Sequence, residues 1–352
     1  MLSWCRPLSS TVSSLATRTR SNSVCCFGPP SYRLLHHSTA SALSSSAPEK
    51  PLPITIVACS SRIDLLTDLD TPEHPTTAGW PRFLAENTQE TEHLFEEDSL
   101  LKWQFMAILR EGVNAEEKVI GLANSIPFYW STPNDNNSLP DLGWDAVMRS
   151  GLQLDRSLKN AVYDGPKPNA LSAVAVSVDP AYRFKKTGRD IAAELLNTMK
   201  TAARDSGFSA FVLPVRPTGK ASSEEFIKMD FEEYCAKVRG QDGVISGGLL
   251  AFNSCDSGAE PWDPWIRKHI MMGGKIARPA LQGTTIKGTK KEWEKWTGVD
   301  FGAIATGERL TKYGDGKVSV DIMIPGGLVP VKYFPATDTG IYEEPNLWMR
   351  YF

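Results

Sequence analysis

The sequence predicts an α/β protein whose sheet contains a central parallel pair of strands that splays apart at one end. Three observations predict this fold: a strand–helix–strand unit, a separate antiparallel pair of strands, and a proline near the end of the unit's second strand. The unit covers residues 170–215, and such a succession of elements places its two strands parallel to each other.

The first 48 residues differ in composition from the rest and are expected to lie outside this fold. They contain four arginines, thirteen serines and no acidic residue. This composition is typical of a mitochondrial transit peptide, because the membrane potential draws in a cationic segment and acidic side chains would cancel that force. We therefore expect residues 1–48 to be a disordered leader that directs the chain to the mitochondrial matrix. The alternative is a low-complexity segment without an address on a cytoplasmic protein.

Short elements open the fold after the leader. Ile54–Ala58 is predicted to be a strand, and Ser61–Leu69 has helical character. Phe105–Leu109 and Val119–Phe128 are expected to form an antiparallel pair, because a polar segment with turn residues joins them. Trp144–Leu158 has apolar residues at helical spacing and is predicted to be a helix.

The strand–helix–strand unit has the clearest pattern. Ala170–Val178 is an almost continuous run of small and β-branched residues, as expected of a strand buried on both faces. An amphipathic helix follows between Gly188 and Gly207, and a glycine is the usual residue just past a helix end. Phe208–Val215 is the second strand.

Pro214 indicates where the pairing of these two strands ends. Proline removes a hydrogen-bond donor, so it is tolerated at sheet edges, at bulges or where pairing stops. We expect the ladder to open near Leu213 and Pro214, and ligands of open sheets bind outside the carboxyl ends of strands. An edge strand with an incidental proline is the alternative.

A basic turn connects the first strand to the helix. It carries Arg183, Lys185, Lys186 and Arg189 around Gly188. A helix N-terminus offers free amides and positive potential, and glycine lets the backbone approach an anion closely. The turn therefore predicts a pyrophosphate site, with an ordinary solvated turn as the alternative.

The C-terminal third shows two helix starts and a polar patch. Asp263-Pro264 is typical of an N-cap followed by proline, with Gly273-Gly274 ending that helix, and Thr289 with Glu292 forms a capping box. A polar patch with Glu343, Glu344 and Asn346 precedes an aromatic C-terminal strand.

Charge and composition exclude several classes of function. The net charge is −3, and removal of the +4 leader leaves −7 for residues 49–352. This balance argues against a nucleic-acid-binding protein, and no run of 18 apolar residues predicts a membrane span. Only three histidines and three widely spaced cysteines follow the leader, so we expect no metal site and no disulfide framework.

The segment Val176–Asp190 resembles the acetyl-CoA-binding segment of the GNAT superfamily of N-acetyltransferases. There an apolar strand and a proline precede Arg/Gln-x-x-Gly-x-Gly/Ala at the start of a helix. Lys185 stands at the Arg/Gln place and Gly188 at the first glycine. Asp190 stands where glycine or alanine is usual, which places an acidic side chain beside the expected pyrophosphate. Further short segments from about Trp80 to the C-terminus are similar to a less-described GNAT-like subgroup.

The resemblance implies a mixed, mostly antiparallel sheet with helices on both faces and acetyl-CoA in the opening between the parallel strands. It also implies a single elaborated domain over residues 49–352, with an insertion near 219–262 and a C-terminal extension. The strand backbone would pair with the pantetheine arm, and the turn would hold the pyrophosphate. The residues implied for binding acetyl-CoA are Val176, Ser177, Val178, Lys185, Lys186, Thr187, Gly188, Arg189 and Asp190.

Catalysis by direct attack of an amine on the thioester requires a proton acceptor and a proton donor. The residues predicted for catalysis are Tyr234 as the donor, with Glu344 and Asn124. Those predicted to bind the acceptor amine are Ser125, Arg216 and Asn346. Each has an alternative: Tyr234 packed in the core, Arg216 in an ion pair, and the polar strand residues hydrogen-bonded within the fold.

Two functions follow from these residues. The first is an acetyl-CoA-dependent N-acetyltransferase that acts on an amine of a small molecule or a protein. The second is a catalytically silent CoA-binding sensor or regulatory module, which Asp190 and the lack of an evident base keep open. The sequence predicts no nucleic-acid partner and no oligomeric state.

Overall fold

The computed structural model describes residues 52–69, 74–87, 89–112, 116–254, 258–307, 311–312 and 318–352. Residues Pro51–Phe352 form one compact unit. The predicted leader, residues 1–48, lies outside the described residues.

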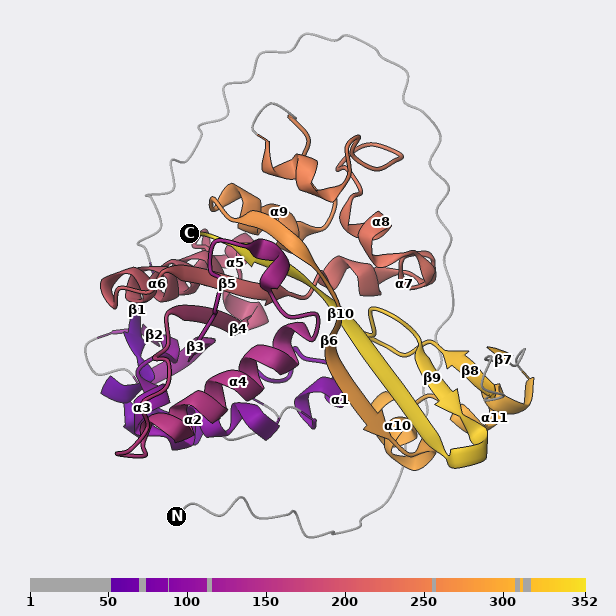
Figure 1. Cartoon of the computed structure of the whole chain (residues 1–352), viewed down its shortest axis with the longest axis horizontal. Helices are drawn as coiled ribbons and strands as arrows, with labels where there is room; N and C mark the ends of the chain where they lie inside the picture. Colours follow the sequence, from indigo (N-terminus) through magenta and orange to yellow (C-terminus); the bar gives the residue numbers. More distant parts are fainter. Residues whose placement is uncertain are drawn as a thin grey trace, which may run out of the picture. The chain divides into compact units, whose positions relative to one another are not determined.

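A ten-stranded mixed sheet forms the centre of the described structure (Figure 1). Its strands follow the order β1-β2-β3-β4-β5-β10-β9-β8-β7, and β6 pairs with β10 off this path. Only β4 and β5 are parallel; every other pair in the described sheet is antiparallel. The strands are β1 (Ile54–Ala58), β2 (Phe105–Arg110), β3 (Glu117–Phe128), β4 (Ala170–Val178), β5 (Ala210–Val215), β6 (Lys275–Gly288), β7 (Thr311–Lys312), β8 (Val318–Ile322), β9 (Val331–Phe334) and β10 (Thr339–Arg350).

Two long helices cover opposite faces of this sheet. Helix α4 (Gly143–Leu158) packs on one face, where alternate strand residues such as Val174 and Val212 point, and α6 (Ile191–Asp205) packs on the other. The predicted fold class, a mixed and mostly antiparallel sheet with helices on both faces, is therefore confirmed. The shorter helices are α1 (Arg82–Ala85), α2 (His93–Glu96), α3 (Asp98–Leu101), α5 (Phe184–Thr187), α7 (Glu224–Lys228), α8 (Phe231–Cys235), α9 (Pro264–Met271), α10 (Lys290–Thr297) and α11 (Phe301–Gly307).

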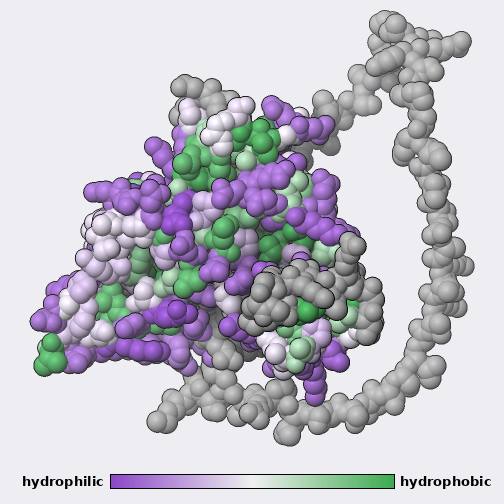
Figure 2. All heavy atoms as spheres, turned by 45° about the vertical axis from the view of Figure 1, so that its right-hand side comes forward, coloured by the Kyte–Doolittle hydropathy of each residue, from purple (hydrophilic) through white to green (hydrophobic). Residues whose placement is uncertain are grey.

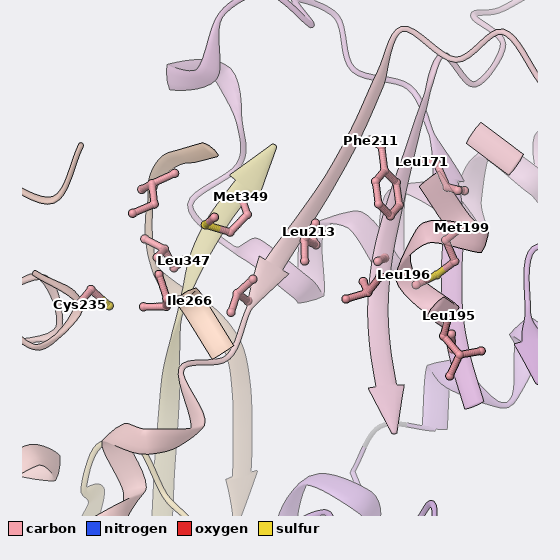
Figure 3. Close-up of a cluster of buried hydrophobic side chains, with 14 of the residues drawn as sticks. Leu171, Leu195, Leu196, Met199, Phe211, Leu213, Cys235, Ile266, Leu347 and Met349 are labelled. Atoms are coloured by element: carbon pink, nitrogen blue, oxygen red, sulfur yellow. The ribbon is translucent and has the colours of Figure 1, made fainter. Parts of the chain in front are cut away.

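The largest apolar core lies on the α6 face. Figure 3 shows Leu195, Leu196 and Met199 of α6 beside Leu171 and Phe211 of the parallel strands, and all five are buried. Burial of such a side chain contributes about 1.5–3 kcal/mol to folding. The core extends across β10 and α9, so the strand–helix–strand unit and the C-terminal strands share one apolar layer.

The parallel pair splays apart as predicted. Its paired register covers Ala170–Ser172 against Ala210–Val212 and then ends, although both strands continue. The backbone amide and carbonyl of Phe211 form hydrogen bonds with Phe352 and Tyr351, which follow β10. Backbone groups of successive strand residues point to opposite sides, so those of Pro214 face β4. Pro214 therefore lacks a donor only on the side where pairing has already stopped.

Several local predictions are confirmed and one is wrong. Asp263 caps α9, and Thr289 with Glu292 forms the capping box of α10. The expected helix over Ser61–Leu69 is wrong, because short 3₁₀ turns occupy Cys59–Leu69 instead. Among the described residues no helix is long and apolar enough to cross a membrane. On the face that Figure 2 shows, hydrophilic side chains alternate with smaller apolar areas.

Candidate active site

The opening between β4 and β5 is bordered on the β4 side by backbone groups without a strand partner. The Asp179 amide donates to the carbonyl of Ile120 in β3 at 2.8 Å, so alternate residues of β4 face β3. The backbone groups of Val176 and Val178 therefore face the opposite side, toward β5, beyond the point where the β4–β5 register ends. The backbone groups of Val176 and the Val178 amide can therefore bind an extended ligand lying between the two strands, whereas the Val178 carbonyl accepts a hydrogen bond from the Arg183 guanidinium at 3.4 Å.

Trp144, at the start of α4, spans this opening on one face of the sheet. A bulge in β4 leaves Val174 without a partner on β3, and the Val174 carbonyl accepts a hydrogen bond from the Trp144 indole at 3.0 Å. The Trp144 amide donates at 3.2 Å to the Asn346 side chain of β10. The first turn of α4 is thus tied both to β4 and to β10, on either side of β5.

Glu344 and Arg216 form a buried network beside this turn. The Nε of Arg216 lies 2.9 and 3.0 Å from the two carboxylate oxygens of Glu344. The Tyr342 hydroxyl donates to the same carboxylate at 2.5 Å, and Arg216 also donates to the carbonyl of Gly326. Burial and the negative charge of Glu344 raise the pKa of Tyr342 well above its ordinary value. The predicted polar patch therefore lies within β10, not before a strand.

Asp145 lies next to this network and was not predicted from the sequence. Its Oδ2 accepts a hydrogen bond from the Thr285 amide of β6 at 3.0 Å. Burial raises the pKa of its carboxyl to about 6, although the Thr285 amide acts in the opposite direction. An acidic residue in the first turn of a helix is common, so the sequence around Asp145 does not distinguish it. Its position beside Thr285 could have been found only by predicting β6, which the sequence did not reveal.

Asn124 borders the other side of the opening. It lies opposite Ala175 of β4, is 7% exposed, and its Oδ1 has no hydrogen-bond partner among the described residues. On the same face the Trp80 indole donates to the Ser177 hydroxyl at 3.0 Å. An unsatisfied buried oxygen costs free energy, so a ligand that donates to it would gain affinity.

Ser125 and Tyr234 lie in structural packing. The Ser125 hydroxyl donates to the carbonyl of Trp103 at 2.6 Å, on the opposite face from Asn124. The Tyr234 hydroxyl donates at 3.0 Å to Asp263, the N-cap of α9, and the Tyr234 ring packs in the core beside α8. Burial raises the pKa of Tyr234 far above its ordinary value. The structure brings neither side chain to Trp144 or Glu344.

The basic turn forms a short helix, α5, that uses several of its own amides. The amides of Thr187 and Gly188 donate to the carbonyls of Arg183 and Phe184, and Gly188 has φ +69°. The Arg189 amide donates to the Thr187 hydroxyl at 3.1 Å. The side chains of Lys185 and Lys186 lie outside the described part of the structure.

The last two residues of the turn are engaged with other elements. The Arg189 guanidinium pairs with Glu194 at 2.6 Å and donates to the Leu52 carbonyl at 2.9 Å. Asp190 caps α6 through the Ala193 amide, as an acidic residue at this place can do, and its two oxygens lie 2.6 and 2.8 Å from Lys268 of α9. Lys268 is a cation at the helix start that the sequence reading missed, because it is 78 residues away in the chain.

A comparison with curated proteins identifies the family. The chain is 30% identical over 305 residues to the arginine N-acetyltransferase avaD of Aspergillus versicolor, across 84% of this chain and 92% of that protein. The chain belongs to the GNAT-type N-acetyltransferases. It is an acyl-CoA-dependent acetyltransferase. No family model matches its sequence.

Solved structures similar to this acetyltransferase are more distant. The loading GNATL domain of CurA from Lyngbya majuscula has 14% identity and a TM-score of 0.43, over 85% of this chain and 96% of that one. The GphF GNAT-like decarboxylase in complex with isobutyryl-CoA has 18% identity and a TM-score of 0.36, over 66% and 90% of the two chains.

Proposed function

We propose that this acetyltransferase moves the acetyl group of acetyl-CoA onto the amine of a cationic small molecule, by direct attack of the amine on the thioester. The observation that carries the proposal is the β4–β5 opening, which has unpaired backbone on one side and buried polar side chains on the other. The family relationship supports acyl transfer at such a site.

The donor would lie in the opening with its pantetheine arm along β4. The backbone groups of Val176 and the Val178 amide face that space and can pair with the amides of the arm, as a neighbouring strand would, while the Val178 carbonyl accepts from Arg183. The pyrophosphate would lie at the basic turn, with Lys185 and Lys186 supplying charge. The amides of Thr187 and Gly188 donate within the turn, so they serve the pyrophosphate only after α5 rearranges.

The acceptor proposed here is the amino group of arginine or of a related cationic amine. The support comes from the curated relative, whose name gives arginine as the acceptor. Carboxylates at the opening agree with a cation, because Asp145 and Glu344 lie on the face where the first turn of α4 covers the sheet.

Incubation of the purified full chain with acetyl-CoA and an amine panel that includes L-arginine tests the proposal. We expect free thiol to appear in equal amount to N-acetylarginine, measured by a thiol reagent and by mass spectrometry. Tight acetyl-CoA binding without transfer to any amine would favour the silent CoA-binding sensor instead. The absence of CoA binding would contradict both functions.

We also propose that residues 1–48 direct the enzyme to the mitochondrial matrix. Their arginine- and serine-rich, acid-free composition supports this location. A fluorescent protein fused behind residues 1–48 should enter mitochondria, and the same fusion with Arg6, Arg18, Arg20 and Arg33 changed to Gln should stay in the cytoplasm. Cytoplasmic fluorescence from the unchanged fusion would contradict the proposal.

A further inference from the structure

Asp145 differs from the buried carboxylates of the described structure, because it forms no ion pair and accepts from no hydroxyl there. Asp155 bonds to Ser99 at 2.6 Å and to Lys159 at 2.8 Å, and Asp179 pairs with Lys118. Asp263 accepts the Tyr234 hydroxyl and three amides, and Glu344 is held by Arg216 and Tyr342. Asp145 makes no ion pair in the described part of the chain, and the Thr285 amide is the donor that its carboxylate receives there.

Charged side chains from three elements act on the Asp145 carboxyl. Glu344 of β10 and Glu90 of the turn before α2 both raise the pKa of its carboxyl, and Arg149, one turn along α4, lowers it. The charge of Glu344 is itself balanced by Arg216. From β6, the amide of Thr285 donates a hydrogen bond to the carboxylate. No described side chain forms an ion pair with this half-buried carboxylate, so a cation that binds there gains a direct interaction that the longer-range effect of Arg149 does not supply.

The position of Asp145 relative to the β4–β5 opening is fixed by its neighbour. Trp144 reaches across the opening to the Val174 carbonyl, while its amide is held by Asn346 on the far side of β5. Asp145 follows directly and points to β6, beside Glu344. The carboxylate therefore lies at β6, next to β10, whereas the backbone of β4 that faces the proposed donor lies on the other side of β5.

Glu344 is less suited than Asp145 to take up a proton. Both of its oxygens already accept the Arg216 Nε, and one also accepts the Tyr342 hydroxyl. Protonation of Glu344 would leave the buried Arg216 charge without its partner, which is costly. Asp145 has no such partner to lose.

We propose that Asp145 binds the ammonium group of the acceptor and accepts one of its protons. This inference rests on the proposed function and names the base of that reaction. The ammonium gives one proton to the Asp145 carboxylate, and the neutral nitrogen bonds to the thioester carbonyl carbon. The carbon–sulfur bond then breaks, and the CoA sulfur leaves with the second proton that the nitrogen loses. Asp145 returns its proton to solvent, so each turnover releases one amide, one thiol and one proton.

The variant Asp145→Asn tests the inference, because Asn retains an oxygen that can accept from Thr285. We expect kcat for L-arginine to fall at least a hundredfold, within the range known for general bases, while KM for acetyl-CoA stays within about twofold. The matched control is Asp155→Asn, which changes a partnered carboxylate of the same helix and should leave kcat nearly unchanged. Equal kcat in Asp145→Asn and the native enzyme would overturn the inference and leave the proposed function standing.

Binding provides a readout that does not depend on turnover. In the presence of CoA, L-arginine should bind the native enzyme measurably by calorimetry, and at least tenfold more weakly to Asp145→Asn but not to Asp155→Asn. In the native enzyme this affinity should fall as the pH drops through about 6, the pKa of Asp145, because a neutral carboxyl no longer attracts the cation. Arginine bound at Asp145 without acetyl transfer would overturn the proposed function and the proton-acceptor role that rests on it, and would leave only the cation site. An arginine affinity that is the same in Asp145→Asn as in the native enzyme would overturn the inference. If that variant folds poorly, the native enzyme decides, and an affinity that does not change with pH would overturn the inference.

Discussion

At the scale of single residues, two glycines hold Asn346 against the start of α4. A Cβ on Gly283 would lie 2.1 Å from the Asn346 Oδ1, far inside contact distance. A Cβ on Gly143, which has φ +40°, would lie 2.8 Å from the same oxygen and from the Gly283 backbone. Glycine at both positions therefore lets Asn346 reach the Trp144 amide and keep α4 over the opening.

The substitution Gly283→Ala should damage the site from outside it. The new methyl group displaces Asn346, so the Trp144 amide loses its acceptor and α4 shifts. We expect a loss of about 1–3 kcal/mol in the free energy of unfolding, typical of overpacking, and a lower kcat. Gly243→Ala is the control, because a Cβ there meets open space. Denaturant unfolding of both variants measures the difference, and equal stabilities would contradict this account.

His269 predicts how stability depends on pH. Its ring is fully buried, with Nδ1 2.8 Å from the Tyr351 hydroxyl, and burial lowers its pKa from 6.5 to about 3. Between these values the unfolded chain binds a proton that the folded protein does not. Stability should therefore fall as the pH drops from 6 to 4, with a contribution of up to about 1.4 kcal/mol per pH unit from His269.

The variant His269→Asn isolates this contribution. Its stability should depend less steeply on pH between 6 and 4 than that of the native protein, whatever its absolute stability. His93→Asn, at a half-buried position, is the histidine control. Urea unfolding at several pH values provides the comparison, and parallel curves for all three proteins would refute the role of His269.

At the scale of elements, the sequence predicts local units well and long-range pairing poorly. The strand β4 has the predicted bounds, and α6 and β5 differ from theirs by a few residues, because apolar periodicity and glycine are local signals. Strand β6 was missed because Pro279 and Gly283, residues unusual inside a strand, interrupt its pattern. Asp145 and the Arg216–Glu344 pair depend on β6 and β10, so the sequence could name Arg216 and Glu344 but not their contact.

The basic turn, α5, carries a prediction about the donor. Reversal of two charges in Lys185→Glu with Lys186→Glu should weaken CoA binding at least tenfold, since the turn would then repel the phosphates. The melting temperature should hardly change. Lys290→Glu with Lys291→Glu on α10 makes the same change in net charge and should leave the affinity unaffected. Calorimetric titration with CoA is the measurement, and intact affinity in the first variant would rule out the pyrophosphate assignment.

The N-terminus of α6 carries a second prediction, because Asp190 places a negative charge where the pyrophosphate is expected. Asp190→Asn keeps a cap for the Ala193 amide, removes the charge and releases Lys268. We expect CoA to bind about two- to fivefold more tightly, the scale of a partly exposed charge interaction. Asp190→Ala should in addition lose about 1 kcal/mol of stability with its cap. Weaker binding by the Asn variant would show that the Asp190–Lys268 pair assists the donor.

At the scale of the whole molecule, the N-terminal strand β1 is held in the compact unit by specific contacts. Strand β1 pairs with β2 along its full length, and Ile54 and Ile56 pack against the main core. The Arg189 guanidinium, next to the proposed donor site, donates to the carbonyl of Leu52. Residues from about 52 onward are therefore part of the folded enzyme, and β1 is linked to the basic turn.

Two truncations separate the leader from this strand. A chain that starts at residue 49 should keep the melting temperature and the acetyltransferase activity of the full chain, because the contacts of β1 are all retained. A chain that starts at residue 59 loses β1 and the Arg189 contact, and should lose at least about 2 kcal/mol of stability with the apolar burial of the two isoleucines. Thermal unfolding and CoA release by both chains measure these effects. A removable leader must be dispensable for stability and activity. A loss of stability on removal of residues 1–48 alone would therefore contradict the prediction and show that these residues pack on the enzyme.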